Sequence, residues 1–79
     1  MARYFFDTFD DGVWSRDTEG LELIDLQAAC TQAVKALPYM ALDALPDGPS
    51  RELAVEVRDE AGTRVFRAEL LFRSEWLAQ

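Results

Sequence analysis

Apolar and polar residues alternate over positions 51–73, and this alternation limits the folds open to the chain. Successive side chains of a β-strand point to opposite faces, so this pattern predicts a β-hairpin with one apolar face. A loop that ends at Gly62 separates its two strands. The apolar positions of the pattern are Leu53, Val55, Val57, Phe66, Ala68, Leu70 and Phe72.

The register of this hairpin follows from keeping its apolar residues on one face. A four-residue loop pairs Arg58 with Thr63 and places Val55 opposite Phe66. A register shifted by one residue would place Val55 opposite Arg67 and so mix the two faces. The pattern therefore favours the even-length loop.

A second hairpin is predicted over residues 3–16, where an aromatic strand ends at the turn signal Asp11-Gly12. Two registers are open. A two-residue turn pairs Phe9 with Trp14, whereas a three-residue loop with Gly12 in a bulge pairs Phe9 with Val13.

The charges of the paired residues favour one of these two registers. The two-residue turn also pairs Asp7 with Arg16, and opposite charges directly across two strands stabilise the pairing. The sequence therefore favours the two-residue turn.

The middle of the chain predicts an acidic connection over residues 17–25 and a helix over residues 26–45. Gly20 marks a turn in the connection, and a short extra strand there stays open. Asp25 is a good N-cap, because its carboxylate can accept hydrogen bonds from free amides of the first helical turn. Apolar residues then recur at three- and four-residue steps, which is typical of an amphipathic helix.

Pro38 lies in the middle of this helix, where it removes a backbone hydrogen bond at a cost of roughly 3 kcal/mol. We expect a bent or broken helix there. The resulting fold class is α+β: a single domain over residues 1–79 of order β-β-α-β-β. Its four-stranded, mainly antiparallel sheet has the Pro38-kinked helix packed on one face, and residues 74–79 form a C-terminal tail. The strand order is left open.

The charge of the chain excludes some partners. The net charge is −7, and residues 1–34 hold seven acids against two bases. Binding to a phosphate backbone needs clustered Lys and Arg, so we expect no nucleic-acid partner. No stretch approaches the roughly 20 apolar residues that span a bilayer. One cysteine excludes an internal disulfide, and we expect a soluble, cytoplasmic protein without membrane association.

Catalytic apparatus is missing from the sequence. Histidine, the usual base that activates a Ser or Cys nucleophile, is absent. Cys30 lies on the apolar stripe of the helix, where a thiol packs as a small hydrophobe. We therefore expect no catalytic residues, no cofactor and no metal site. A further alternative, a small carboxylate-based enzyme, would need two or more of Asp7, Asp17, Glu19 and Glu22 to converge in a pocket.

Aromatic residues on both faces of the first strand indicate a contact surface. With one face of the sheet covered by the helix, the other face would expose an apolar patch, the usual mark of a partner site. We expect a non-enzymatic interaction module that forms a homodimer or binds another protein there. The alternative is that the tail, with Trp76 and Leu77, folds back over this face. The candidate interface residues are Phe5, Phe9, Trp14, Val65 and Leu71.

Three motifs resemble a family of small bacterial domains of unknown function. They are an opening Arg3-Tyr4-Phe5-Phe6, the turn Asp17-Thr18-Glu19-Gly20 and the late run Val57-Arg58-Asp59-Glu60-Ala61-Gly62. This resemblance covers almost the whole chain and implies no activity, so no functional residues follow from it. A looser similarity over Tyr4 to Leu37 is to antitoxins of the HicB type, and it implies an acidic binder of a basic protein partner.

Overall fold

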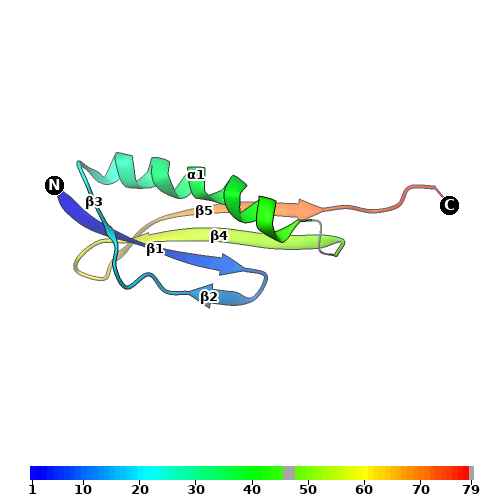
Figure 1. Cartoon of the computed structure of the whole chain (residues 1–79), viewed down its shortest axis with the longest axis horizontal. Coiled ribbons are helices and arrows are strands. Elements are labelled where there is room, and N and C mark those ends of the chain that lie inside the picture. Colours follow the sequence, from blue (N-terminus) through cyan, green and yellow to red (C-terminus); the bar gives the residue numbers. More distant parts are fainter. Residues whose placement is uncertain (46–47, 79) are drawn as a thin grey trace.

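The structure, a computed structural model, describes residues 1–45 and 48–78. Within these ranges it contains one helix, and its strands form an antiparallel sheet with the helix across one face (Figure 1). The α+β class predicted from the sequence is confirmed. In chain order the elements are β1 (Ala2–Asp10), β2 (Val13–Ser15), β3 (Leu21–Leu23), α1 (Leu26–Ala44), β4 (Ser50–Arg58) and β5 (Arg64–Arg73).

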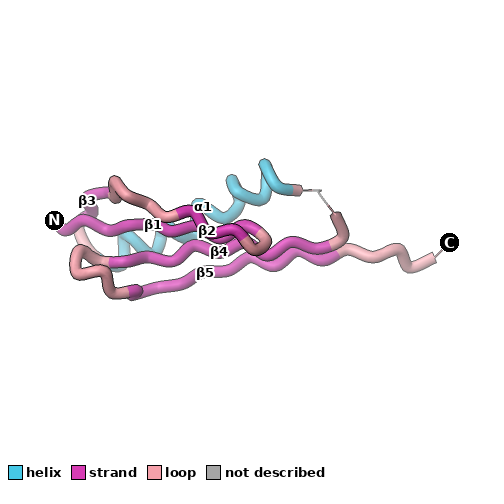
Figure 2. The backbone as a smooth tube through the Cα atoms, turned by 90° about the horizontal axis from the view of Figure 1, so that it is seen from below, coloured by secondary structure: helices cyan, strands magenta, loops and turns pink. Residues whose placement is uncertain are grey.

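The strand order, which the sequence left open, is β2-β1-β4-β5, with β3 paired to β1 beside β2 (Figure 2). Along one edge of β1, β2 pairs at the C-terminal end and β3 at the N-terminal end, where Arg3 lies opposite Glu22. The short strand in the acidic connection therefore forms, and the sheet has five strands rather than four.

The first hairpin has the two-residue turn. Phe9 lies opposite Trp14, which confirms the favoured register. Asp11 has φ 47° and Gly12 has φ 101°, and positive φ at both central residues is what a tight hairpin turn of this twist requires. The turn therefore lies at Asp11-Gly12, where the sequence predicted it.

The second hairpin forms where it was predicted, but its register is shifted by two residues. Val55 lies opposite Ala68, and Phe66 lies opposite Val57. The predicted pairing of Val55 with Phe66 is wrong. Because the shift is an even number of residues, the apolar side chains still share one face.

An odd loop and a bulge together produce this shift. Arg58 pairs with Arg64 across a loop of residues 59–63. The Asp59 carboxylate closes the loop by accepting hydrogen bonds from two loop amides, at 3.0 and 2.9 Å. A β-bulge then leaves Val65 without a cross-strand partner. By itself, the odd loop would turn the apolar side chains of β5 to the open face. The extra residue in the bulge turns them back to the helix side.

The helix begins at the predicted cap and continues through its proline. The Asp25 carboxylate accepts a hydrogen bond from the Ala28 amide at 2.9 Å. α1 then runs to Ala44 with Pro38 inside it, so of the two predicted alternatives the broken helix is wrong, while the bend at Pro38 stays a prediction. Pro38 lies on the exposed side, where water can replace the hydrogen bond that proline removes.

The core lies between α1 and the middle of the sheet and contains few large side chains. Ala29 and Ala33 of α1 are fully buried against it. Leu53, Val55 and Val57 of β4 are the largest fully buried side chains in the described part of the chain. Burial of each contributes about 1.5–3 kcal/mol, so the domain has little stability in reserve.

The C-terminal tail leaves the body of the domain. Residues 74–78 continue past the end of the sheet in the direction of β5 (Figure 1). Trp76 and Leu77 are each 89% exposed. The alternative that these residues fold back over the open face is therefore wrong for the described tail; residue 79 lies outside the described residues.

Gly20 provides a test of how β3 is placed. Its φ is +72°, and a Cβ at this position would lie 2.8 Å from the carbonyl oxygen of Tyr4. We expect Gly20→Ala to lower the free energy of unfolding by about 2–3 kcal/mol, measured by urea denaturation. Gly62→Ala is the matched control, because φ is +86° there but the space around the new Cβ is open. It should lose only about 1 kcal/mol, and equal losses would contradict the close packing at Gly20.

Candidate functional site

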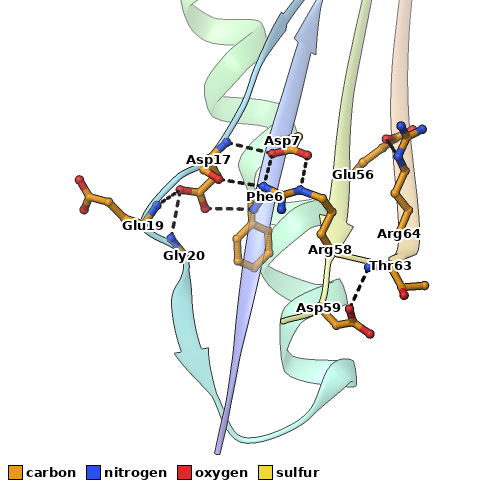
Figure 3. A network of polar contacts seen from close by, with 10 residues as sticks. All are labelled: Phe6, Asp7, Asp17, Glu19, Gly20, Glu56, Arg58, Asp59, Thr63 and Arg64. Atoms are coloured by element: carbon orange, nitrogen blue, oxygen red, sulfur yellow. Dashed lines mark hydrogen bonds and ion pairs between the residues drawn. The ribbon is translucent and has the colours of Figure 1, made fainter. Parts of the chain in front are cut away.

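A cluster of polar contacts lies on the open face of the sheet, around an ion pair between β1 and β4 (Figure 3). The Arg58 guanidinium donates to both oxygens of the Asp7 carboxylate, from Nε at 2.7 Å and from Nη2 at 3.1 Å. Both residues are buried, with exposures of 7% and 8%. The guanidinium also lies over the Phe5 ring at 4.9 Å from its centroid. Hydrogen bonds on its edge and an aromatic ring on its face hold Arg58 in one orientation.

The same contacts correct the predicted partner of Asp7. The sequence paired Asp7 with Arg16, but β2 ends before Arg16 and the carboxylate binds Arg58. Arg58 faces Phe5, the neighbour of Asp7 on the same face of β1. A side chain from a strand far along the sequence therefore replaces the local partner.

Asp17 completes this cluster from the acidic connection. Its backbone amide donates to Asp7 Oδ1 at 2.9 Å, and its carbonyl accepts from Arg58 Nη2 at 2.8 Å. Its carboxylate accepts from the amides of Phe6, Glu19 and Gly20 at 3.0–3.1 Å. The Phe6 amide lies at the edge of β1, between the residues that pair with β2 and those that pair with β3. Asp17 therefore accepts a hydrogen bond from a backbone amide that has no partner in either short strand.

Only part of the predicted carboxylate group comes together. Asp7 and Asp17 meet, whereas Glu19 points away from the cluster (Figure 3) and Glu22 forms an exposed ion pair with Arg3 at 3.5 Å. Asp7 lines a hollow on the open face, while Asp17 lines the depressions on either side of the connection. The two carboxylates therefore do not face one common cavity.

The electrostatics of the cluster keep both acids ionised. The Arg58 hydrogen bond lowers the pKa of Asp7, although burial opposes this. At Asp17 burial raises the pKa, but the three backbone donors outweigh it and the pKa lies below its usual value. The pKa of Arg58 is raised by its bond to Asp7. A carboxyl group that stays ionised at neutral pH and already accepts these bonds is poorly suited to act as a general acid.

The predicted interface residues are divided by the structure. Phe5, Phe9, Trp14 and Leu71 lie on the open face, as the strand registers place them. Val65 does not, because the bulge turns it against the helix-side core. Trp14 is 48% exposed and Leu71 66% exposed, whereas Phe5 is half-buried under Arg58.

An aromatic pair forms the apolar part of this face near β2. The rings of Phe9 and Trp14 have centroids 5.0 Å apart at an angle of 53°. Arg67, which reaches across from β5, lies 5.7 Å from the centre of the Trp14 ring and donates to Glu56 Oε2 at 2.7 Å. Beside Trp14 is a hollow of about 330 Å³ over Asp7. The patch is therefore aromatic at one end and lined by paired charges, rather than continuously apolar.

A second depression lies on the helix side. It has a volume of about 480 Å³ and lies between α1 and the connection, with Phe6 and Val55 among its apolar lining and Gln32 on the helix. No buried polar side chain in residues 1–45 and 48–78 lacks a hydrogen-bond partner there or elsewhere.

The sequence did not identify Arg58 and Asp17 as partners of Asp7. Asp17 had a local signal, since an Asp whose side chain bonds the amides two and three residues later is a common turn device, and Gly20 stands at that spacing. Arg58 had none: its contact with Asp7 joins positions 51 apart in the sequence.

The comparison with protein families supports the resemblance seen in the motifs. A family described as a domain of unknown function (DUF6894) matches residues 3–71. The chain belongs to this family. The matched region of this DUF6894 domain includes β1 to β4, α1 and most of β5, and it leaves the tail outside. No curated protein and no solved structure matches the chain. The similarity to HicB-type antitoxins receives no support from these comparisons and stays a prediction.

In residues 1–45 and 48–78, no helix of the DUF6894 domain is long and apolar enough to span a membrane. The same residues contain no group of three or more acidic, Cys or His side chains arranged to hold a metal ion.

The lowered pKa values predict acid sensitivity. Asp7 and Asp17 have folded-state pKa values below the model-compound value of 3.8. Their contribution to stability is therefore present above that value and is lost as the pH falls through the lower folded-state pKa. We expect the free energy of unfolding, measured by urea denaturation, to fall between pH ~4 and pH ~2. Asp17→Asn should reduce this fall, and an unchanged slope in that variant would contradict the assignment.

A double-mutant cycle tests the buried ion pair. Asp7→Asn leaves Arg58 buried without its counter-charge, and we expect it to cost about 3–5 kcal/mol of unfolding free energy. Adding Arg58→Met should recover part of this loss; if Asp7→Asn alone does not fold, recovery of folding in the double variant, seen by circular dichroism, is the readout. The exposed pair Arg67–Glu69 is the control, with a coupling of at most about 1 kcal/mol. Comparable coupling in the two pairs would contradict the role of burial.

Proposed function

We propose that this DUF6894 domain is a non-enzymatic protein-interaction module that self-associates and uses its open sheet face as a contact surface. The observation that carries this proposal is the Phe9–Trp14 pair with Arg67 beside it on that face. Trp and Arg side chains dominate the binding energy of protein interfaces, and here they are held together on a rigid sheet instead of a loop.

The state of the potentially reactive groups supports a non-enzymatic role. Asp7 and Asp17, the acids that converge, are saturated by hydrogen bonds that tie the connection to the sheet. Cys30 is half-buried on α1, and the sequence contains no histidine to serve as a base. The polar cluster therefore acts as a structural support beneath the contact surface.

The charge distribution supports self-association on this face. The chain as a whole has a net charge of −7, so two copies repel each other over most of their surface. The open face is balanced, with Asp7, Glu52, Glu56 and Glu69 against Arg58, Arg64, Arg67 and Arg73. A two-fold related copy can therefore place acids against arginines on this face without net repulsion.

The small core supports the same conclusion. Only Leu53, Val55 and Val57 are large side chains that are fully buried in the described residues. Domains of this size often gain the missing apolar burial from a second copy. We propose a cytoplasmic setting as well, on the composition of the chain alone.

Sedimentation velocity across a dilution series tests this proposal. The wild-type chain should show concentration-dependent association, and Trp14→Ser should weaken it by roughly 30-fold, as expected for the loss of a central interface tryptophan. Tyr39→Ser is the matched control, because Tyr39 is an aromatic residue, 71% exposed, on the outer side of α1. A wild-type chain that stays monomeric at every concentration would contradict the proposal, as would equal effects of the two substitutions.

A further inference from the structure

The two edges of the sheet are protected very differently. On one side, β1 is bordered by two strands of only three residues each, and Asp17 satisfies the amide between them. On the other side, β5 is a strand of ten residues with no neighbour beyond it in the described residues (Figure 2). A long unpaired edge presents a row of backbone donors and acceptors to another strand.

The tail lengthens this free edge. The Ser74 amide still bonds the carbonyl of Pro49 at 2.6 Å, and beyond this point no strand of residues 1–45 and 48–78 pairs with the chain. Residues 75–78 nevertheless continue in line with β5 (Figure 1). The tail is therefore positioned as a strand extension that lacks its partner.

We infer that two copies of this chain pair antiparallel along β5 and the tail, about a two-fold axis at Leu71, and so form one continuous sheet. In this arrangement residues equally distant from Leu71 in the sequence face each other. The β5 strand of each copy then supplies the neighbour that the tail of the other lacks. This is strand addition at a sheet edge, with the same surface used by both copies.

The charges of β5 and the tail fit this register. Glu69 faces Arg73 of the second copy, and Arg67 faces Glu75 of the second copy. By symmetry each pair occurs on both sides of the axis, and no like charges meet. Directly opposed acid–base pairs stabilise antiparallel strands, and here they fix the alignment as well.

Neighbouring registers are worse. An axis at Leu70 sets Arg67 against Arg73, and an axis at Phe72 sets Glu69 against Glu75. An axis at Ala68 pairs Arg67 with Glu69 but places the tail opposite the loop at residues 59–63 rather than against a strand. Each slip of this kind either opposes like charges or leaves the tail without a partner.

Exposed apolar side chains gather where this contact would form. Leu70, Leu71 and Trp76 are 38%, 66% and 89% exposed. On the helix face, Leu70 also borders an open apolar groove formed with α1, in which Leu42 is 76% exposed. In the proposed dimer Leu70 faces Phe72 of the second copy and Trp76 faces Phe66, so one contact removes this apolar surface from water.

This inference rests on the proposed self-association but uses a different surface from the open face. Because the two-fold axis runs perpendicular to the sheet, both helices stay on one side and both open faces lie together on the other. The edge contact would double the open face, and two such dimers could then meet face to face.

Charge reversal at Arg73 tests the edge contact. Arg73→Glu opposes Glu69 with a second glutamate, and we expect dimerisation, measured by sedimentation velocity, to weaken by roughly 10- to 30-fold. The swapped variant Glu69→Arg/Arg73→Glu should restore it. Lys35→Glu is the control, since it changes the net charge equally at an exposed position of α1 and should have little effect.

Disulfide trapping tests the register. In a Cys30→Ser background, Leu71→Cys should form a covalent dimer on oxidation, because residues facing each other across antiparallel strands have Cα atoms about 4.5–5.5 Å apart, within disulfide range. Ala68→Cys should not, since residue 68 then faces residue 74 of the second copy. Efficient trapping through Ala68→Cys with none through Leu71→Cys would overturn this register.

These outcomes separate the edge contact from the open-face contact. Glu69, Leu71 and Arg73 also lie on the open face, so the edge contact is supported by weakening through Arg73→Glu, rescue by the swap and trapping through Leu71→Cys when all three persist in a Trp14→Ser background. Association that is lost in Trp14→Ser but unaffected by Arg73→Glu would overturn the edge contact and leave the proposed function standing. A strict monomer at every concentration would overturn both.

Discussion

The bidentate ion pair between Arg58 and Asp7 is the interaction on which the rest of the open face depends. It connects β4 to β1, and through Arg58 Nη2 and the Asp17 amide it also fastens the connection that follows β2. Both charges are buried, so each needs the other and its further hydrogen bonds to offset the loss of water. Three parts of the chain are thereby held in one arrangement beneath the exposed aromatic pair.

The same cluster protects one edge of the sheet. β2 and β3 each cover only a few residues of β1, and the Asp17 carboxylate takes the amide of Phe6 that they leave unpaired. With this edge closed and α1 across one face, the parts of the sheet that stay open in the described residues are the opposite face and the edge of β5. Both carry exposed apolar side chains beside charges of both signs. A domain whose core has so few large buried residues gains from covering either of them.

The sequence predicted most of the fold, because most of it depends on neighbouring residues. The Asp11-Gly12 turn set the first hairpin, the alternation in β4 and β5 set the second, and Asp25 marked the start of the helix. The register predicted for the second hairpin is wrong because the strand contains a bulge at Val65. An odd loop followed by this bulge keeps the apolar side chains on one face, as an even loop would. The alternation of apolar residues therefore could not distinguish the two. This difference also moved Val65 from the open face to the core.

The amino-acid sequence alone was enough to predict the class of fold, the face of most sheet residues and membership of a family of unknown function, and it shows that the chain has no histidine. These follow from composition, motifs and contacts between residues a few positions apart. Tertiary structure alone decided the strand order, the partner of Asp7 and the direction of the tail. Asp7 binds Arg58, which lies 51 positions away in the sequence. Arg16, the partner predicted from the sequence, does not pair with Asp7 because β2 ends before it. Such a choice between partners is made only when distant strands come together in the folded sheet.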